Sequence, residues 1–170
     1  MKIQILALLI LLTTGHGAHA STDDSLFWAV MGSDEEKVER LIAGGADVNR
    51  QDRHGTTSLH VAAKFGNRKL TELLLAAGAN VNGKDTCGIT ALHYAAESNA
   101  EDVMQLLLNA NAEINKQNCF GETPLHYASQ YGSNEAVQLL KAAGADTEIK
   151  NYDGYTAEES ITHNDIKMRR

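Results

Sequence analysis

The chain has 170 residues, with 22 acidic and 15 basic side chains and a formal net charge of −7. This length suits one domain, and a composition of 43% hydrophobic and 22% charged residues excludes a wholly disordered chain, a collagen-like fibre and a multi-span membrane protein. The acidic balance disfavours a nucleic-acid-binding protein, because binding to phosphates requires a positive surface.

The first twenty residues are organised like a secretory signal peptide. A cationic start at Lys2 precedes an apolar run over residues 3–12, and the segment ends in the small-x-small triplet 18–20. The run is about half as long as the ~20 residues of a membrane-spanning helix. We therefore expect cleavage after Ala20 and an exported mature chain without a stable membrane anchor. The missing Asn-x-Ser/Thr acceptor favours a periplasm in a Gram-negative bacterium, with secretion as the alternative.

A repeat of 33 residues organises the remaining chain. Each repeat carries a glycine, a threonine two residues later and, in three repeats, a histidine five residues after the glycine. An Asp or Asn three residues before each glycine predicts a tight turn. The recurring positions are Gly55, Gly88, Gly121 and Gly154; Thr57, Thr90 and Thr123; His60, His93 and His126; and Asp52, Asp85, Asn118 and Asn151.

Two short segments with helical spacing of apolar residues follow each turn. Between and after the segments stand glycine or asparagine, the residue types that adopt left-handed C-caps. These columns are Gly66, Asn99 and Gly132, and Gly45, Gly78, Asn111 and Gly144. Each repeat is therefore predicted to contain a turn and two helices, with leucine triplets 73–75 and 106–108 in the core.

The repeat resembles the ankyrin family, whose T-P-L-H-x-A signature appears as TSLHVA at 57–62, TALHYA at 90–95 and TPLHYA at 123–128. The resemblance implies an all-α repeat solenoid of stacked turn-and-two-helix units, about four repeats plus a C-terminal half repeat. It implies an ankyrin repeat domain over 21–170. Its expected parts are an N-terminal cap repeat at 21–51, full repeats at 52–84, 85–117 and 118–150, and a half repeat at 151–170.

The N-terminal cap repeat carries a sequence signal for a helix start. The residues Ser33-Asp34-Glu35-Glu36 have the Ser-x-x-Glu spacing of a capping box. Acidic residues also suit the positive end of a helix. We expect Ser33 to be the N-cap of the second helix.

The recurring histidines are predicted to be structural. Histidines of successive repeats should stand about 8 to 10 Å apart, as packed helices do, whereas ligands of one metal each lie about 2 Å from it. The resemblance implies that each histidine, with its threonine, hydrogen-bonds the backbone at the start of the first helix. No nucleophile elbow, phosphate-binding loop or His-Glu-x-x-His motif occurs in the sequence. We therefore expect no catalytic residue, no metal and no cofactor.

Cys87 and Cys119 both fall in predicted turns, at the third and second positions of their repeats. Adjacent turns should be about one repeat apart, beyond the roughly 7 Å between Cα atoms that a disulfide tolerates. The spacing therefore disfavours an intramolecular bridge, although bent turns would shorten the distance. A crosslink to a partner or a redox role stays open.

The resemblance places the variable positions of the repeat on the turn tips and the inner face of the first helix, which form a concave surface. Five of the nine aromatic residues fall there, and exposed aromatics dominate interface energetics. Some of them would instead stack on neighbouring turns. The candidate partner-binding residues are Arg53, His54, Lys64, Phe65, Ile89, Glu97, Phe120, Glu122, Tyr131, Tyr152 and Tyr155.

Within this set, Phe120 and Tyr131 are expected to form an anchor. Glu97 and Glu122 suit a partner with Lys or Arg at its rim. Trp28 and Tyr94 lie one place after the histidine column or its equivalent, and we expect them to be packing residues.

These features favour a monomeric, exported, non-enzymatic module that binds another protein through a rigid concave face. An alternative is a secreted effector of an intracellular bacterium that acts on a host protein. A hypothesis of another class is a small redox or hydrolytic enzyme that uses His54, Cys87 or Cys119.

Overall fold

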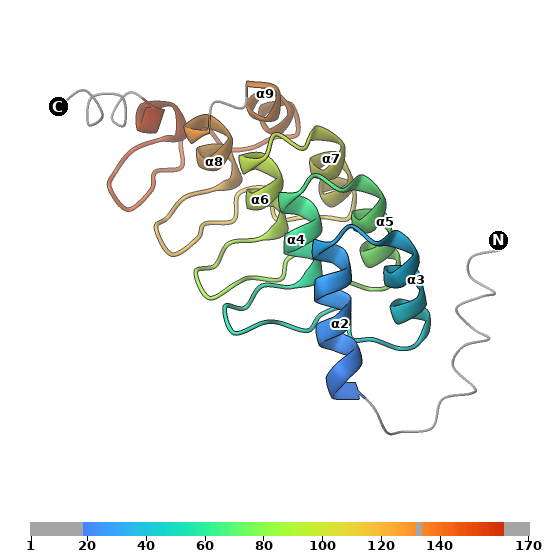
Figure 1. Ribbon diagram of the computed structural model, residues 1–170. Helices are drawn as coiled ribbons and strands as arrows, with labels where there is room; N and C mark the ends of the chain where they lie inside the picture. The colour runs from blue at the N-terminus through green and yellow to red at the C-terminus, as the bar shows by residue number, and fades with distance from the viewer. Residues whose placement is uncertain (1–18, 132–133, 162–170) are drawn as a thin grey trace.

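The computed structural model describes residues 19–131 and 134–161, which form a solenoid of stacked helix pairs (Figure 1). Of the predicted signal peptide, only positions 19 and 20 fall within these ranges, where they open the first helix. Gly132 and the end of the predicted half repeat, residues 162–170, also lie outside the described residues.

The helices form two parallel stacks. The inner stack contains α2 (His19–Met31), α4 (Ser58–Lys64), α6 (Ala91–Glu97) and α8 (Pro124–Gln130). The outer stack contains α3 (Glu35–Ala43), α5 (Arg68–Ala76), α7 (Glu101–Asn109) and α9 (Asn134–Ala142). Each helix packs on its partner and on the next helix of its own stack. No strand occurs in the described ranges, so the predicted all-α solenoid is confirmed.

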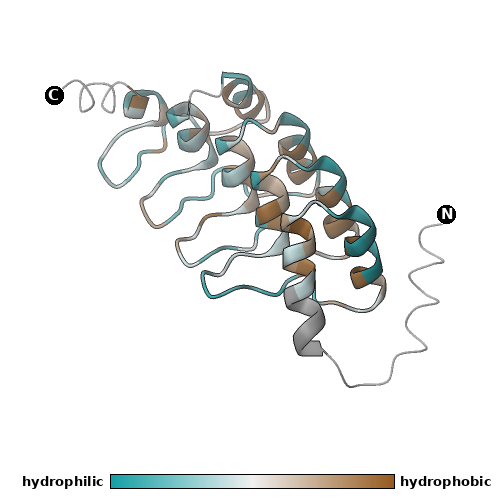
Figure 2. Cartoon of the chain, in the orientation of Figure 1, coloured by the Kyte–Doolittle hydropathy of each residue, from teal (hydrophilic) through white to brown (hydrophobic). Residues whose placement is uncertain are grey.

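The core lies between the two stacks and between successive repeats. Leu74 and Leu107 are fully buried, and Leu73, Leu75 and Leu108 pack half-buried against this core. The outer helices turn their hydrophobic residues toward the inner helices and their hydrophilic ones outward (Figure 2). Each fully buried leucine contributes roughly 1.5 to 3 kcal/mol, so the packing predicted from the leucine triplets is the main source of stability.

Each inner helix after α2 begins with a threonine and histidine pair. The Thr57 backbone N–H donates to His60 Nδ1 at 3.0 Å, and the Thr57 hydroxyl lies 2.9 Å from the same nitrogen. Because Nδ1 accepts from a backbone N–H, Nε2 carries the hydrogen and donates to the Gly83 carbonyl at 3.1 Å. His93 and His126 make the same bonds and donate to carbonyls of the following repeat. All three histidines therefore cap their own helices, and His93 and His126 also link neighbouring repeats, whereas His60 bonds within its own repeat.

The left-handed C-caps expected from sequence are confirmed at the described positions. Gly66 and Asn99 have φ of 63° and 53° between the helices, and Gly45, Gly78, Asn111 and Gly144 have φ of 65° to 91° after them. Ser33 also has a positive φ of 54°, so its prediction as an N-cap is wrong. Asp34 is the N-cap of α3, and its carboxylate accepts from the Lys37 N–H at 3.0 Å. Ser33 occupies the place that Gly66 holds one repeat later, which explains the shift by one residue.

The turns of neighbouring repeats are hydrogen-bonded to each other. The Thr86 N–H donates to the His54 carbonyl at 2.9 Å, and Tyr152 and Phe120 make the same bond. This close approach explains the turn glycines. A Cβ at Gly55, which has a φ of 75°, would lie 2.8 Å from the Thr86 nitrogen. The turns therefore form a continuous row along one side of the solenoid (Figure 1).

Candidate functional site

The candidate site is the side of the solenoid that carries the turns, which we call the inner face. It consists of the turn residues 52–56, 85–89, 118–122 and 151–155 and the inner helices α4, α6 and α8 with the residue that follows each. The turns all project from the same side as these helices (Figure 1). All the partner-binding candidates from sequence fall on this face.

Four of the five predicted aromatic residues are well exposed on the inner face. Phe65 and Phe120 are each 59% exposed, Tyr131 is 55% exposed and Tyr152 is 75% exposed. Tyr155 is less exposed than these four, since it is half-buried at the base of the last turn. Its carbonyl accepts from His126, and its N–H donates to Asn151. The four exposed aromatic side chains therefore do not belong to the hydrophobic core.

These aromatic side chains come from two parts of the repeat, the end of the first helix and the turn tip. Phe65 and Tyr131 are the C-caps of α4 and α8, with Ser98 at the same position between them. Phe120 and Tyr152 lie at turn tips, where the Tyr152 N–H donates to the Phe120 carbonyl at 2.9 Å. The aromatic residues therefore extend over both the turn row and the helix ends.

Charge is unevenly distributed along the inner face. The first repeat carries Arg53 and His54, which are both exposed and bonded to each other from Nε to Nε2 at 3.0 Å, and Lys64 at the end of α4. The next two repeats carry Glu97 and Glu122, both half-buried. The inner face therefore runs from basic to acidic along the chain.

Ile89 contributes little exposed surface. Its side chain is half-buried against the core, and both its backbone N–H and its carbonyl bond to Asp85 within the same turn. The structure thus places this candidate at the base of its turn.

The tyrosines of the inner helices keep their hydroxyl protons. Burial raises the pKa of Tyr94 well above its ordinary range and that of Tyr127 to about 12, with nearby carboxylates adding to both shifts. The Tyr94 hydroxyl donates to Asp85 Oδ2 at 3.1 Å, and the Tyr127 hydroxyl accepts from Asn118 Nδ2 at 3.1 Å. Each tyrosine is thereby tied to the turn of its own repeat, which agrees with the packing role expected for Tyr94.

The packing role expected for Trp28 is wrong, because this side chain is 65% exposed. Tyr94 and Tyr127 each bond to a turn residue nine positions earlier. Nine positions before Trp28 the chain is already helical in α2, so no turn covers the indole. Trp28 instead lines an open hollow with Phe27 and the turn residues 50–54. The signal in the sequence was that His19 and Thr22 stand where the later repeats carry the Asp or Asn and the Gly of the turn.

The two cysteines form a disulfide, contrary to the sequence expectation. Their Cα atoms lie 5.1 Å apart, and the Cys119 N–H donates to the Cys87 carbonyl at 2.7 Å. Neighbouring turns pair residues separated by 32 positions, one fewer than the repeat, and the cysteines have this separation. The distance of one repeat expected between the turns was too long, because it ignored this offset in the pairing of residues. A disulfide leaves no thiolate for catalysis at either position.

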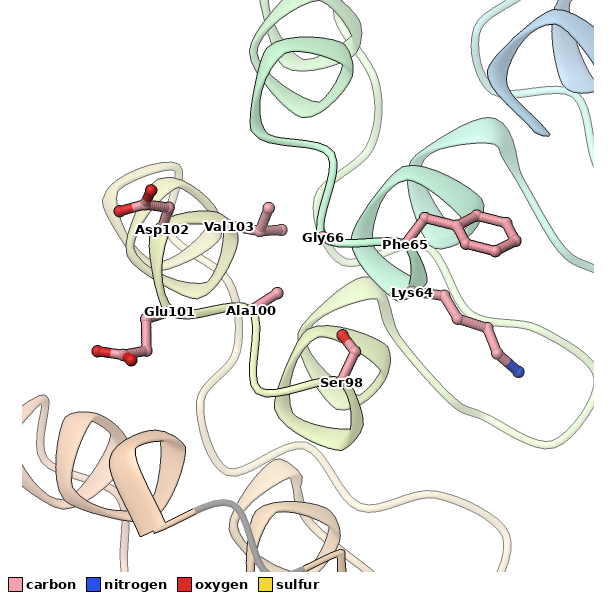
Figure 3. A pocket seen from close by; sticks show the side chains of 8 residues that line it. All are labelled: Lys64, Phe65, Gly66, Ser98, Ala100, Glu101, Asp102 and Val103. Carbon is pink, nitrogen blue, oxygen red and sulfur yellow. The ribbon is translucent and has the colours of Figure 1, made fainter. Parts of the chain in front are cut away.

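Another hollow lies between the segments that connect inner and outer helices (Figure 3). Small side chains form its centre, while Lys64 and Phe65 point away from Glu101 and Asp102 (Figure 3). Its polar groups therefore do not converge on a common point, as they would in a catalytic or small-molecule site.

Within residues 19–131 and 134–161, no three His, Cys, Asp or Glu side chains are grouped as a metal site would require. None of the helices in these ranges has the length and apolar character needed to cross a membrane.

Comparison with known families agrees with the repeat architecture. The family model described as ankyrin repeats (3 copies) matches residues 3–85, 26–118 and 78–151, which together extend over most of the chain. No curated protein matches the chain.

Proposed function

The chain belongs to the ankyrin repeat family, and we propose that it is an exported, non-enzymatic protein that binds a partner protein through its inner face. Ankyrin repeats are generally modules for protein–protein interaction. The observation that carries the proposal is the set of aromatic side chains on that face, Phe65, Phe120, Tyr131 and Tyr152, which are 55 to 75% exposed.

Exposed aromatic side chains of this kind favour a binding role. A large apolar ring in water gains free energy when a partner covers it, and tyrosine and tryptophan are enriched among the residues that dominate interfaces. Neither the turn bonds nor the helix caps require an aromatic ring at Phe120 or Tyr131. Their side chains are therefore available for a partner.

Bonds between repeats favour a rigid surface. Asn49 Oδ1 accepts from the Asn80 N–H at 2.7 Å, and Asn82 and Asn115 make the same bond one and two repeats later. The turn bonds and the Cys87–Cys119 disulfide connect the other side of the repeats. A surface held in this way loses little conformational entropy on binding, which favours affinity.

Export to a periplasm is supported by two independent features. The first twenty residues have the pattern of a signal peptide, and disulfides persist in oxidising compartments such as the periplasm. We expect the mature monomer to begin at Ser21, within α2. Intact-mass measurement of protein from the envelope fraction checks this start, and retention of Met1 would contradict export by cleavage.

The binding face is tested with the double variant Phe120→Ala/Tyr131→Ala. Wild-type and variant proteins are immobilised, the native partner is identified by crosslinking and mass spectrometry, and its Kd is then measured with purified components. We expect the variant to weaken binding by roughly 2 kcal/mol or more, about thirtyfold in Kd, because both rings are removed from the interface. The thermal midpoint should change little because both side chains are exposed.

Ile161→Ala is the matched control, because Ile161 is exposed and apolar but lies beside α8 and α9 after the last turn, outside the residues that define the inner face. It should bind like the wild type. A double variant that unfolds readily, or that binds as tightly as the wild type, would show that the aromatic residues are not the binding surface.

A further inference from the structure

A cation from the chain itself lies on the inner face between the first and second full repeats. Lys64 ends α4, and its Nζ lies 5.4 Å from the centre of the Tyr94 ring in α6. The hydroxyl of Tyr94 donates to the Asp85 carboxylate at 3.1 Å. At this point the chain combines an aromatic ring, a carboxylate and an ammonium group.

One repeat later the same positions hold a ring without a cation. Glu97 ends α6, as Lys64 ends α4, and Tyr127 of α8 takes the place of Tyr94. A second ring is added, because Tyr131 lies with its ring centre 6.1 Å from that of Tyr127. The repeat symmetry therefore puts a carboxylate where the preceding repeat has an ammonium group.

A second carboxylate borders the same rings. Asn118 Nδ2 donates to the Tyr127 hydroxyl at 3.1 Å and lies 3.4 Å from Glu122 Oε2, so Glu122 is adjacent to the tyrosine. Burial raises the pKa of Tyr131, and the negative charges of Glu97 and Glu122 raise it further. The two rings thus lie in a negative potential, with Tyr127 buried beneath and the Tyr131 side chain open to solvent.

We propose that Tyr127, Tyr131, Glu97 and Glu122 form a site that receives an arginine or lysine side chain of the partner protein. The proposal rests on the proposed function and specifies the chemistry of the partner. A cation over the face of a tyrosine is attracted by the ring, and a carboxylate beside the ring adds a charge-assisted hydrogen bond. The partner's cation would lie against the exposed Tyr131 ring and pair with the Glu97 carboxylate, which stands at the position equivalent to Lys64.

The site is tested first with a single side chain as the probe. N-acetyl-arginine amide is titrated into ¹⁵N-labelled mature protein, with uncharged N-acetyl-norleucine amide as the control ligand. We expect saturable shifts confined to residues around Tyr131, with a Kd on the order of 1 to 10 mM, because one side chain offers few contacts. Equal shifts with the norleucine compound, or no localised shift, would overturn the proposal.

Glu97→Lys is the decisive variant, because it gives this site the internal cation that Lys64 supplies one repeat earlier. A lysine at the end of α6 also suits the negative end of the helix, so the variant should fold. We expect it to abolish the localised shifts and to weaken binding of the purified partner at least tenfold. Glu39→Lys on the outer helix α3 makes the same charge change at an exposed position and should have neither effect.

The two proposals fail in different ways. If Glu97→Lys binds the partner as the wild type does while the Phe120→Ala/Tyr131→Ala variant loses it, the basic-side-chain site is wrong and the protein-binding face stands. If the wild type captures no partner although the arginine probe binds, the proposed function is wrong and the site for a basic side chain stands.

Discussion

Cys87 and Cys119 are joined twice, by a backbone hydrogen bond of 2.7 Å and by a disulfide between Cα atoms 5.1 Å apart. The same offset of 32 residues pairs His54 with Thr86 and Phe120 with Tyr152 through the backbone bond alone. The cysteines therefore place a covalent bond in the middle of the turn row, directly before Phe120. This bond holds the surface that carries the exposed aromatic residues.

Removing the disulfide should lower stability. The double variant Cys87→Ser/Cys119→Ser opens a loop between residues 32 apart, for which the loss of chain constraint predicts a decrease of roughly 3.7 kcal/mol in the free energy of unfolding. Urea denaturation followed by circular dichroism measures this difference. The wild type with dithiothreitol should behave like the variant, and a wild type insensitive to the reductant would contradict the prediction.

Acidification should destabilise the protein through its buried histidines. Burial lowers the pKa of His93 from its ordinary 6.5 to about 4, and burial also lowers that of His60. A histidine whose folded pKa is depressed stabilises the fold fully above pH 6.5, and this contribution is lost as the pH falls toward 4. For His93 the loss amounts to roughly 3 kcal/mol. Urea midpoints measured between pH 7.5 and pH 4 check the slope.

The matched variant for this prediction is His93→Gln. Glutamine at the third helical position can still accept from the Thr90 backbone N–H, as in a capping box, but it does not titrate. We expect the variant to be less stable than the wild type at neutral pH and to lose less stability on acidification. Identical pH dependence in both proteins would show that His93 does not carry the effect.

Two glycines with similar backbone angles should respond differently to alanine. Gly121 has a φ of 76°, and a Cβ there would meet the Tyr152 ring at 2.6 Å and its backbone nitrogen at 2.8 Å. Gly144 has a φ of 91° with nothing within 4 Å of a Cβ. We expect Gly144→Ala to cost about 1 to 2 kcal/mol from backbone strain alone, and Gly121→Ala to cost clearly more. Thermal denaturation of the two variants compares them, and equal losses would contradict the close approach of the turns.

Trp28 should be accessible to solvent in the folded protein. It is the single tryptophan of the chain and is 65% exposed, and the position nine residues before it lies in α2 and not in a turn. Acrylamide should therefore quench its fluorescence nearly as well as it quenches N-acetyl-tryptophanamide. Urea should change the emission maximum little. Quenching that is strongly suppressed in the native state would show that another part of the chain covers the indole.

The repeat architecture can be derived from the sequence alone, because each repeating position has a local physical reason. Glycine and asparagine adopt left-handed caps, Asp and Asn close the turns, and leucines at helical spacing create the buried faces. Exposure of Phe65, Phe120, Tyr131 and Tyr152 was also expected, since no local role requires an aromatic ring there.

The contacts between neighbouring repeats, in contrast, follow from the three-dimensional stacking. The offset of 32 residues between bonded turns brings Cys87 to Cys119, and the helical start of α2 at His19 goes with an uncovered Trp28. Glu97 stands one repeat after Lys64, at the equivalent position. This difference in charge matters for binding because Lys64 lies over the Tyr94 ring of the next repeat. Such relationships depend on the stacking of one repeat against the next, and the spacing of residues within a repeat contains no information on that geometry.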